Sequence, residues 1–317
     1  MSIGIIGAGA FGTALAVALS ANDDILLWGR NADQIEAIQQ TGRNERYLPG
    51  LDLPNRIGAT AQLDDLAKVD VILLALPAQQ TARFLSEHEL PATPLVLCAK
   101  GIDAKTHRLQ SELATTAPDG LAVLTGPGFA VELARGLPTA LTLACEDTGL
   151  GARLQKMLST PRLRLYLTTD ITGAQLGGAM KNVVAIACGI AVGAGLGESA
   201  KAALMTRGFT EMQRLGVAMG AQRETFAGLS GLGDLALTCG SEMSRNFAAG
   251  LAVGKGGGVQ PGVTVEGAPT AGAACALATE HGVEMPIAAT VAAVLDGKLN
   301  VAQAMEALLS RPLKEES

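Results

Sequence analysis

A single lysine inside a long apolar segment is the first feature of this sequence that points to chemistry. Residues 174–195 read AQLGGAMKNVVAIACGIAVGAG, and Lys181 is the only residue with a full charge between Ile171 and Gly197. Burial disfavours the charged ammonium, so the pKa of such a lysine falls unless an anion lies near it. A lysine that titrates near neutral pH can donate or accept a proton in catalysis. We interpret Lys181 as a general acid or base; the alternative is a lysine whose flexible stem carries the ammonium to the surface.

Further polar residues lie beside glycines or after apolar runs, where ligands bind to open α/β sheets. Lys100 follows such a run in CAKGID, and Asp234 stands in the glycine-rich sequence GLSGLGDLALTC. Arg245 and Asn246 are adjacent in EMSRNF. Each has an ordinary explanation, as a turn cation, a helix N-cap or a surface residue. Together they offer Lys and Arg for a phosphate group, and Asn and Asp for hydroxyl groups.

A glycine fingerprint for a nucleotide lies near the first residue. The sequence GIIGAGAFG places Gly7, Gly9 and Gly12 in the spacing G-x-G-x-x-G, after an apolar run and before a helical pattern. In this setting the first glycine allows a tight turn, the second lets a pyrophosphate approach the backbone, and the third lets the helix pack closely on the strand. The helix N-terminus adds N–H donors and a positive dipole. The alternative is an ordinary glycine-rich turn.

The end of the second apolar run indicates which dinucleotide is bound. NAD sites usually carry an acidic residue there, about 20 residues beyond the fingerprint, which binds the ribose hydroxyls. This chain has LLWGRN instead, with Arg30 at the end of the run and Asp33 further on. Because a guanidinium suits a 2′-phosphate, we expect NADP(H) to be preferred. If Arg30 only stacks on adenine or faces solvent, NAD(H) would serve as well.

The elements that must hold these residues alternate in the first half of the chain. Short apolar runs ended by glycine, proline or a polar residue are typical of buried parallel strands. We expect strands in SIGIIG, DILLWGR, DVILLALP, PLVLCAKG, GLAVLTGP and TALTLAC. Helical patterns stand between them in AFGTALAVALSA and NADQIEAIQQTG and over residues 79–86, 106–116, 128–135 and 148–158. This alternation predicts an α/β, Rossmann-type, doubly wound and mostly parallel sheet.

The second half of the chain has a different pattern. Strand-like runs stop at about residue 166, and long helical patterns follow, the first with Thr169 or Asp170 as its N-cap. We predict a dinucleotide-binding domain over residues 1–166 and an all-α substrate and catalytic domain over residues 167–317. The glycines among residues 173–197 weaken a helix, so we expect another backbone, a cofactor or a substrate to lie close to them.

Composition argues against several classes of function. The net charge is −6 with no basic cluster, so we expect no nucleic-acid partner. The five cysteines form no CxxC motif and lie mostly in apolar runs, which indicates reduced thiols and a cytoplasmic protein. The segment around Lys181 is glycine-rich with an internal charge, so we expect no membrane span. The three histidines do not have the spacing that is typical of metal ligands, and we predict no metal site.

A series of motifs resembles those of the bacterial NAD(P)-dependent glycerol-3-phosphate dehydrogenases over nearly the full chain. They are GIIGAGAFGTALA, LWGR, CAKGI, GPGFAVELARGLPTA, GAMKNVVAIACGI, LSGLGDLALTC, SRN, VEG and GVEMPI. The resemblance implies a Rossmann-type domain followed by an all-α domain like that of 6-phosphogluconate dehydrogenase. It also implies reduction of dihydroxyacetone phosphate to sn-glycerol 3-phosphate, which feeds glycerophospholipid synthesis. We further expect a homodimer, which the small-residue helices would suit.

The resemblance also implies a role for each matching residue. Lys181 would be the catalytic proton donor or acceptor at the C2 oxygen of the substrate, with Asn182 beside it. The substrate would be bound by Lys100, Gly126, Gly128, Lys181, Asp234, Ser244, Arg245 and Asn246, the last two at its phosphate. The dinucleotide would be bound by Gly7, Gly9, Ala10, Phe11, Gly12, Arg30, Lys100, Ala130, Arg245, Val265 and Glu266.

The chain departs from the family pattern in places, and other functions stay open. Gly128 stands where Ser, Thr or Asn is usual, so one hydrogen bond to the substrate would be absent or come from water. Phe11 stands where Trp is frequent. A β-hydroxyacid dehydrogenase would share the Lys-Asn pair on its first long helix, although SRN after GLGD favours a phosphorylated triose. A non-catalytic NADP-sensing module would bind cofactor but catalyse no reaction. Lys181→Ala would then keep cofactor binding, and there would be no turnover to lose.

Overall fold

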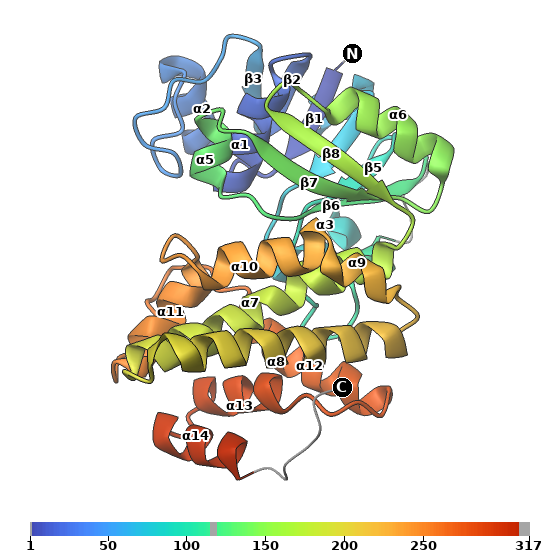
Figure 1. The fold of residues 1–317 in the computed structure, drawn as a ribbon. Helices are drawn as coiled ribbons and strands as arrows, with labels where there is room; N and C mark the ends of the chain where they lie inside the picture. Colours follow the sequence, from blue (N-terminus) through green and yellow to red (C-terminus); the bar gives the residue numbers. More distant parts are fainter. Residues whose placement is uncertain (1, 115–118, 311–317) are drawn as a thin grey trace.

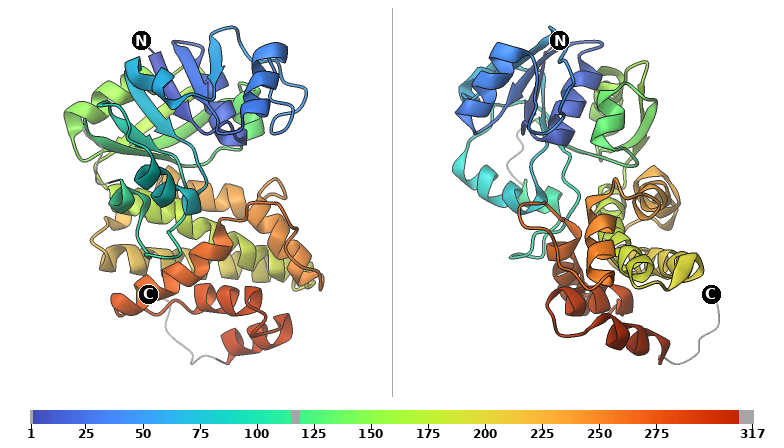
Figure 2. Two further views of the ribbon diagram at one scale, coloured as in Figure 1. Left: turned by 180° about the vertical axis from the view of Figure 1, so that it is seen from behind. Right: turned by 90° about the vertical axis from the view of Figure 1, so that its left-hand side faces the viewer.

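The chain forms a sheet flanked by helices and then a helical part, as the computed structural model shows for residues 2–114 and 119–310 (Figure 1). The sheet lies above the helical part in Figure 1, and the two further views in Figure 2 show the same two-part arrangement. The prediction of an α/β part followed by an all-α part is confirmed.

The strands form one sheet in the order β3-β2-β1-β4-β5-β6-β7-β8. Neighbouring strands are parallel except β6 and β7, so the predicted mostly parallel sheet is confirmed. Because β1 lies between β2 and β4, the chain switches direction across the sheet beside the glycine fingerprint, where ligands bind in such folds. The strands are β1 Ser2–Ile6, β2 Asp24–Trp28, β3 Ile57–Thr60, β4 Val71–Leu74, β5 Leu95–Leu97, β6 Leu121–Thr125, β7 Thr139–Ala144 and β8 Leu163–Thr168.

Helices cover both faces of this sheet. On one face, Ile3, Ile5 and Leu73 pack in a buried cluster with side chains of α1, α2, α5 and α6. On the other face, Ile6 and Leu74 pack with side chains of α3 and of the first turn of α7. The helices of this part are α1 Ala10–Leu19, α2 Ala32–Thr41, the 3-10 helix Leu63–Lys68, α3 Ala78–Glu87, α4 Gln110–Leu113, α5 Ala130–Ala134 and α6 Thr148–Leu158.

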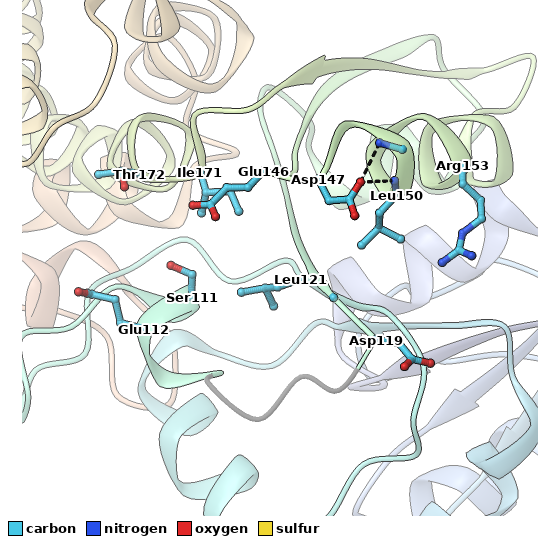
Figure 3. A pocket seen from close by; sticks show the side chains of 12 residues that line it. Ser111, Glu112, Asp119, Leu121, Glu146, Asp147, Leu150, Arg153, Ile171 and Thr172 are labelled. Carbon is cyan, nitrogen blue, oxygen red and sulfur yellow. Dashed lines mark hydrogen bonds between the residues drawn. The ribbon is translucent and has the colours of Figure 1, made fainter.

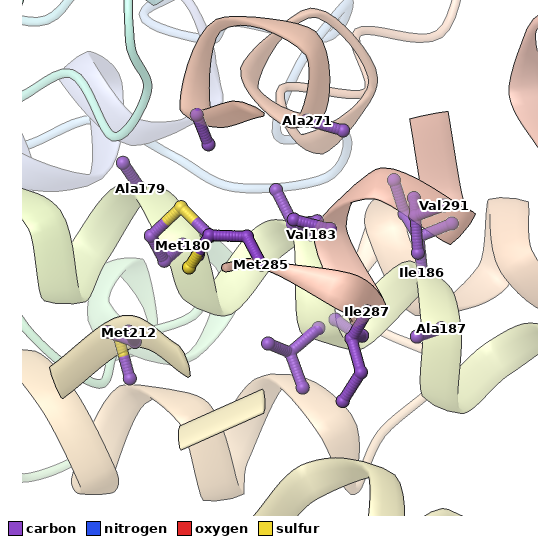
Figure 4. Close-up of a cluster of buried hydrophobic side chains, with 14 of the residues drawn as sticks. Ala179, Met180, Val183, Ile186, Ala187, Met212, Ala271, Met285, Ile287 and Val291 are labelled. Atoms are coloured by element: carbon purple, nitrogen blue, oxygen red, sulfur yellow. The ribbon is translucent and has the colours of Figure 1, made fainter. Parts of the chain in front are cut away.

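The helical part is built around its first helix. In Figure 4, Met180, Val183 and Ile186 of α7 lie in one buried cluster with Met285 and Ile287. By length and composition α7 could cross a membrane. However, 89% of its 18-residue apolar stretch is buried inside the protein, so it is a core helix. The elements are α7 Ile171–Gly193, α8 Gly197–Ala218, α9 Arg223–Ala227, the π-helical turn Leu229–Gly233, α10 Asp234–Cys239, α11 Arg245–Gly254, α12 Gly267–Glu280, α13 Pro286–Leu295 and α14 Val301–Leu309.

Glycines bring the backbones of α7 and α11 into direct contact. A Cβ at Gly189 of α7 would overlap a carbonyl oxygen of α11, and a Cβ at Gly250 of α11 would overlap the carbonyl oxygen of Ile186. Gly193 and Gly254 repeat this arrangement further along the two helices. The expectation that another backbone lies close to these glycines is confirmed.

Two strands appear where the sequence pattern predicts none. β3 and β8 are the two edge strands, and neither has the continuous apolar run of a strand buried on both faces. β8 reads LRLYLT and begins with alternating buried and exposed residues. It ends at Thr168, so the last strand crosses the predicted boundary between residues 166 and 167.

The helix predicted over residues 106–116 is wrong over most of its described length. Only Gln110–Leu113 is helical, and residues 115 and 116 lie outside the described residues. The Asp103 carboxylate instead accepts hydrogen bonds from the N–H groups of Lys105 and Thr106, and His107 has a positive φ of 56°. A local turn made by the aspartate therefore replaces the first helical turn.

The close contact of α7 and α11 predicts opposite effects for two glycine substitutions. We expect Gly250→Ala to destabilise the protein by about 1–3 kcal/mol, because its methyl group would overpack against α7. Gly272→Ala is the matched control, since Gly272 is exposed within α12 and a Cβ there would meet no atom within 4 Å. Because alanine favours a helix by about 1 kcal/mol over glycine, the control should be slightly more stable than wild type. Urea unfolding midpoints measure both, and equal midpoints would contradict the packing argument.

Candidate active site

One buried carboxylate joins the two lysines that the sequence singles out. Asp234 is 1% exposed; its Oδ1 accepts a hydrogen bond from Lys181 Nζ at 2.8 Å and its Oδ2 accepts one from Lys100 Nζ at 2.7 Å. Lys181 also donates to Thr238 Oγ1 at 2.8 Å, and Lys100 donates to the carbonyl oxygen of Gly126 at 2.6 Å. The Lys181 ammonium is thus paired inside the protein and does not reach the surface.

Three elements position this group. Lys181 lies on α7, Lys100 follows β5, and Asp234 begins α10 directly after the π-helical turn. Gly177 packs against that turn, because a Cβ there would lie 2.5 Å from the carbonyl oxygen of Ser230. Gly177 and Lys181 are four residues apart and share one face of α7. The close approach that Gly177 permits therefore holds the start of α10 beside Lys181.

Lys100, Asp234 and Lys181 form a triad of charged groups, and burial and neighbouring charges set its protonation. Burial lowers the pKa of Lys181 to about 8; the charge of Asp234 opposes this shift and the charge of Lys100 adds to it. Burial acts to raise the pKa of Asp234, but the ammonium groups of Lys100 and Lys181 outweigh it, so this pKa lies below its ordinary value. The carboxylate has two counter-ions, whereas each lysine has one and also faces a like charge. At neutral pH, Asp234 is therefore ionised and Lys181 is protonated but close to its titration range.

One N–H of Lys181 has no acceptor among the described residues. An ammonium has three donors, and two of them bind Asp234 and Thr238. Thr238 is absent from the residues predicted from the sequence. It lies four residues after Asp234 on α10, a spacing that places both side chains on the same helix face and could have indicated it.

A chain of amide hydrogen bonds surrounds the triad. Asn182 Nδ2 donates to the carbonyl oxygen of Lys100 at 3.0 Å, and its Oδ1 accepts from Asn246 Nδ2 at 2.8 Å. The N–H of Gly267 in turn donates to Asn246 Oδ1 at 2.9 Å. Arg245, the first residue of α11, is exposed beside these groups. The arrangement leaves a cation at a helix N-terminus, which is where an anionic group binds favourably.

The glycine fingerprint has the geometry that a pyrophosphate requires. Gly7 has φ +120°, and a Cβ at Gly12 would overlap the carbonyl oxygen of Gly7. A Cβ at Gly9, in contrast, would meet no protein atom within 4 Å, so protein packing does not demand glycine there. Within the described residues, the N–H groups of Gly9, Ala10 and Phe11 have no acceptor. Open backbone donors at the start of α1 fit a dinucleotide phosphate.

Arg30 and Lys100, two other residues predicted to bind the nucleotide, follow the carboxyl ends of β2 and β5 at the same edge of the sheet. Arg30 follows β2, is exposed, and forms no ion pair in the described part of the chain. Lys100 Nζ lies 5.9 Å from the ring centre of Phe11, a cation–π distance. Glu266 accepts a hydrogen bond from the N–H of Ala78 at 3.1 Å; burial raises its pKa, and this bond and the charge of Arg245 only partly offset that rise.

Comparisons with known proteins agree on one family. The model of the NAD-dependent glycerol-3-phosphate dehydrogenase N-terminus matches residues 2–150, and the model of the C-terminus matches residues 170–306. The chain belongs to this family. It is 53% and 54% identical to the glycerol-3-phosphate dehydrogenases (NAD(P)+) of Ruegeria sp. and Paracoccus denitrificans, with all of each chain covered. The crystal structure of the glycerol-3-phosphate dehydrogenase of Coxiella burnetii is 37% identical, with a TM-score of 0.92 over 98% of this chain and 99% of that one.

The structure brings most of the predicted site residues together and gives some of them structural tasks. Gly126 and Asn182 join the lysine triad directly, as described above. Ser244 caps α11 by accepting a hydrogen bond from the N–H of Phe247, and Val265 is buried in the helical core. Gly128 has little free space, because a Cβ there would lie 3.3 Å from Thr139 Cγ2. Membership of the glycerol-3-phosphate dehydrogenase family decides against the β-hydroxyacid alternative.

A separate cavity lies away from these residues. It has a volume of about 900 Å³ and is lined by α6, the start of α7 and α4, with Glu146, Asp147 and Arg153 among its side chains (Figure 3). The Asp147 carboxylate is already used as the N-cap of α6, where it accepts hydrogen bonds from the N–H groups of Gly149 and Leu150. None of the predicted site residues lines this cavity.

Proposed function

We propose that the chain reduces dihydroxyacetone phosphate to sn-glycerol 3-phosphate, with Lys181 as the acid. The observation that carries this proposal is a buried ammonium with a pKa of about 8 and one N–H left after binding Asp234 and Thr238. A general acid works best when its pKa lies near the working pH. Lys181 meets that condition because burial and Lys100 offset the attraction of Asp234.

The residues around Lys181 divide the remaining tasks. Arg245 at the start of α11 would bind the phosphate, and Asn182 and Asn246 would hold that helix at a fixed distance from α7. The glycine loop, Phe11 and Arg30 would hold the dinucleotide. The nicotinamide, when bound, supplies or takes up the hydride, and the protein orients the partners.

The proton chemistry follows from the protonation of Lys181. In reduction, the C2 oxygen gains negative charge, and Lys181 donates a proton to it. In oxidation, the neutral amine accepts the proton of the C2 hydroxyl. Lys100 and Asp234 exchange no proton with the substrate. Each stays in its ion pair, and together they keep the free N–H of Lys181 directed to the same place.

The role of Lys181 as acid and base predicts that kcat/KM depends on pH and that substitution of Lys181 removes this dependence. kcat/KM for reduction should fall as pH rises above about 8, because the acid form of Lys181 is lost, and kcat/KM for oxidation should rise up to about the same pH. Lys181→Met should lose about 10²–10⁴-fold in rate and also lose this dependence. Lys181→Arg should be as inactive, since a guanidinium keeps its proton. Dinucleotide binding should persist in both variants.

Lys201→Met on α8 is the matched control for these variants. Lys201 is partly buried and ion-paired with Glu198, but it does not belong to the triad. The control should keep both the wild-type rate and the wild-type pH profile. A Lys181→Met enzyme with wild-type turnover would contradict the proposal. If the wild-type protein showed no turnover and Lys181→Met left cofactor binding unchanged, the NADP-sensing module would be favoured.

We further propose that NADP(H) is preferred because of Arg30, which has no partner of its own in the described residues. Arg30→Ser should raise KM for NADPH about tenfold or more, since a charge-assisted bond to the 2′-phosphate is lost. It should leave KM for NADH nearly unchanged. Arg83→Ser is the control, because Arg83 is an exposed arginine on α3 that pairs with Glu87. If Arg30→Ser weakened both cofactors equally, Arg30 would not be the specificity residue.

The family resemblance also supports a role for the product in lipid synthesis. The product would supply glycerophospholipid synthesis in the cytoplasm.

We also propose a homodimer, although the small residues that suggest it are used within one chain by α7 and α11. Other apolar side chains remain exposed on the helical part, among them Val217 and Leu309.

A further inference from the structure

A carbonyl group in the middle of the glycine loop is held by two side-chain amides. Gln34 Nε2 donates to the carbonyl oxygen of Ala8 at 2.7 Å, and Asn44 Nδ2 donates to the same oxygen at 3.0 Å. Asn44 Nδ2 also donates to Thr13 Oγ1 at 2.7 Å, and Asn44 Oδ1 accepts from Gln34 Nε2 at 3.2 Å. All four amide N–H donors are therefore used, and Asn44 is only 2% exposed.

Holding this oxygen fixes the direction of a donor on the other side of the loop. The peptide unit between Ala8 and Gly9 is planar and trans, so the N–H of Gly9 points opposite to the carbonyl of Ala8. That N–H has no acceptor among the described residues, and the Cβ position of Gly9 is open. Asn44 and Gln34 thus orient the free donor from behind the loop, without occupying its open side.

The segment that carries Asn44 is itself fixed to the sheet part. Residues 42–53 form a loop whose ends meet, because the N–H of Leu53 donates to the carbonyl oxygen of Gly42 at 2.8 Å. Leu48, buried in the cluster on the same sheet face as α1, donates its N–H to the carbonyl oxygen of Asn44 at 2.9 Å. Asn44 is therefore attached at its backbone to a core residue and at its side chain to the glycine loop.

We propose that Asn44, together with Gln34, is a positioning residue for the pyrophosphate of the dinucleotide. The inference rests on the proposed nucleotide site and adds residues outside the glycine fingerprint to it. These two amides act on the part of the ligand that NADPH, NADH and ADP-ribose share. Their effect is therefore independent of the 2′-phosphate, in contrast to that of Arg30.

Equilibrium binding of NADPH, NADH and ADP-ribose tests this inference. Asn44→Ala should weaken all three ligands by the same factor of about ten, because a misdirected N–H loses most of its bond to a charged group. Gln34→Met should act in the same direction; it is half-buried and nearly isosteric, so it keeps the test valid if Asn44→Ala folds poorly. Gln39→Ala is the matched control, since Gln39 also lies on α2 and donates its amide to a carbonyl oxygen, that of Ala59, away from the glycine loop.

Gly9→Ala separates failure of this inference from failure of the nucleotide site. Its methyl group meets no protein atom, so it should leave the melting temperature nearly unchanged and weaken all three ligands. If wild type bound no dinucleotide, or if Gly9→Ala bound as wild type does, the nucleotide site itself would be wrong. If Gly9→Ala weakened binding but Asn44→Ala and Gln34→Met did no more than Gln39→Ala, only the positioning role would be overturned. A loss confined to NADPH would also overturn it.

Discussion

The site depends on one constraint, which is that two ammonium groups share a single buried carboxylate. Replacing water around three charges is costly, and such groups rarely add to stability. We propose that their value here is chemical, because a lysine with a full counter-ion of its own would keep an ordinary or raised pKa. Lys100 competes for Asp234 and adds a like charge, so burial prevails at Lys181. The triad also joins the two parts of the chain, since Lys100 follows a strand and Asp234 begins a helix.

The backbone contacts of α7 make this arrangement possible. Gly177 admits the π-helical turn before Asp234, and Gly189 admits α11. Gly267 of α12 packs in the same way, since a Cβ there would lie 2.6 Å from the carbonyl oxygen of Asn182. Each glycine costs helix stability, but together they place three neighbouring elements within hydrogen-bond reach of the segment around Lys181. A larger side chain at these positions would move Asp234 or Asn246 away from α7.

Much of this could be predicted because it is local in the sequence. Continuous apolar runs identify the central strands, and the glycine fingerprint is specific once it stands between a strand and a helix. An isolated charge in an apolar helix singles out Lys181. The edge strand β8 is missing from the prediction because it lacks the continuous apolar run of the central strands. The helix over 106–116 fails because Asp103 forms a competing turn. Thr238 and Asn44 could not be assigned, because their roles depend on which side chain they meet across the fold.

The charge state of Lys181 in the free enzyme is the most direct test of this account. The side-chain NMR signal of Lys181 can be followed as a function of pH and assigned by its absence in Lys181→Arg. We expect a titration midpoint of about 8, because burial and Lys100 oppose Asp234. A midpoint at or above the ordinary lysine value of 10.5 would show that the ion pair with Asp234 prevails. In that case Lys181 could not act as an acid and base of near-neutral pKa, and the central claim would be wrong.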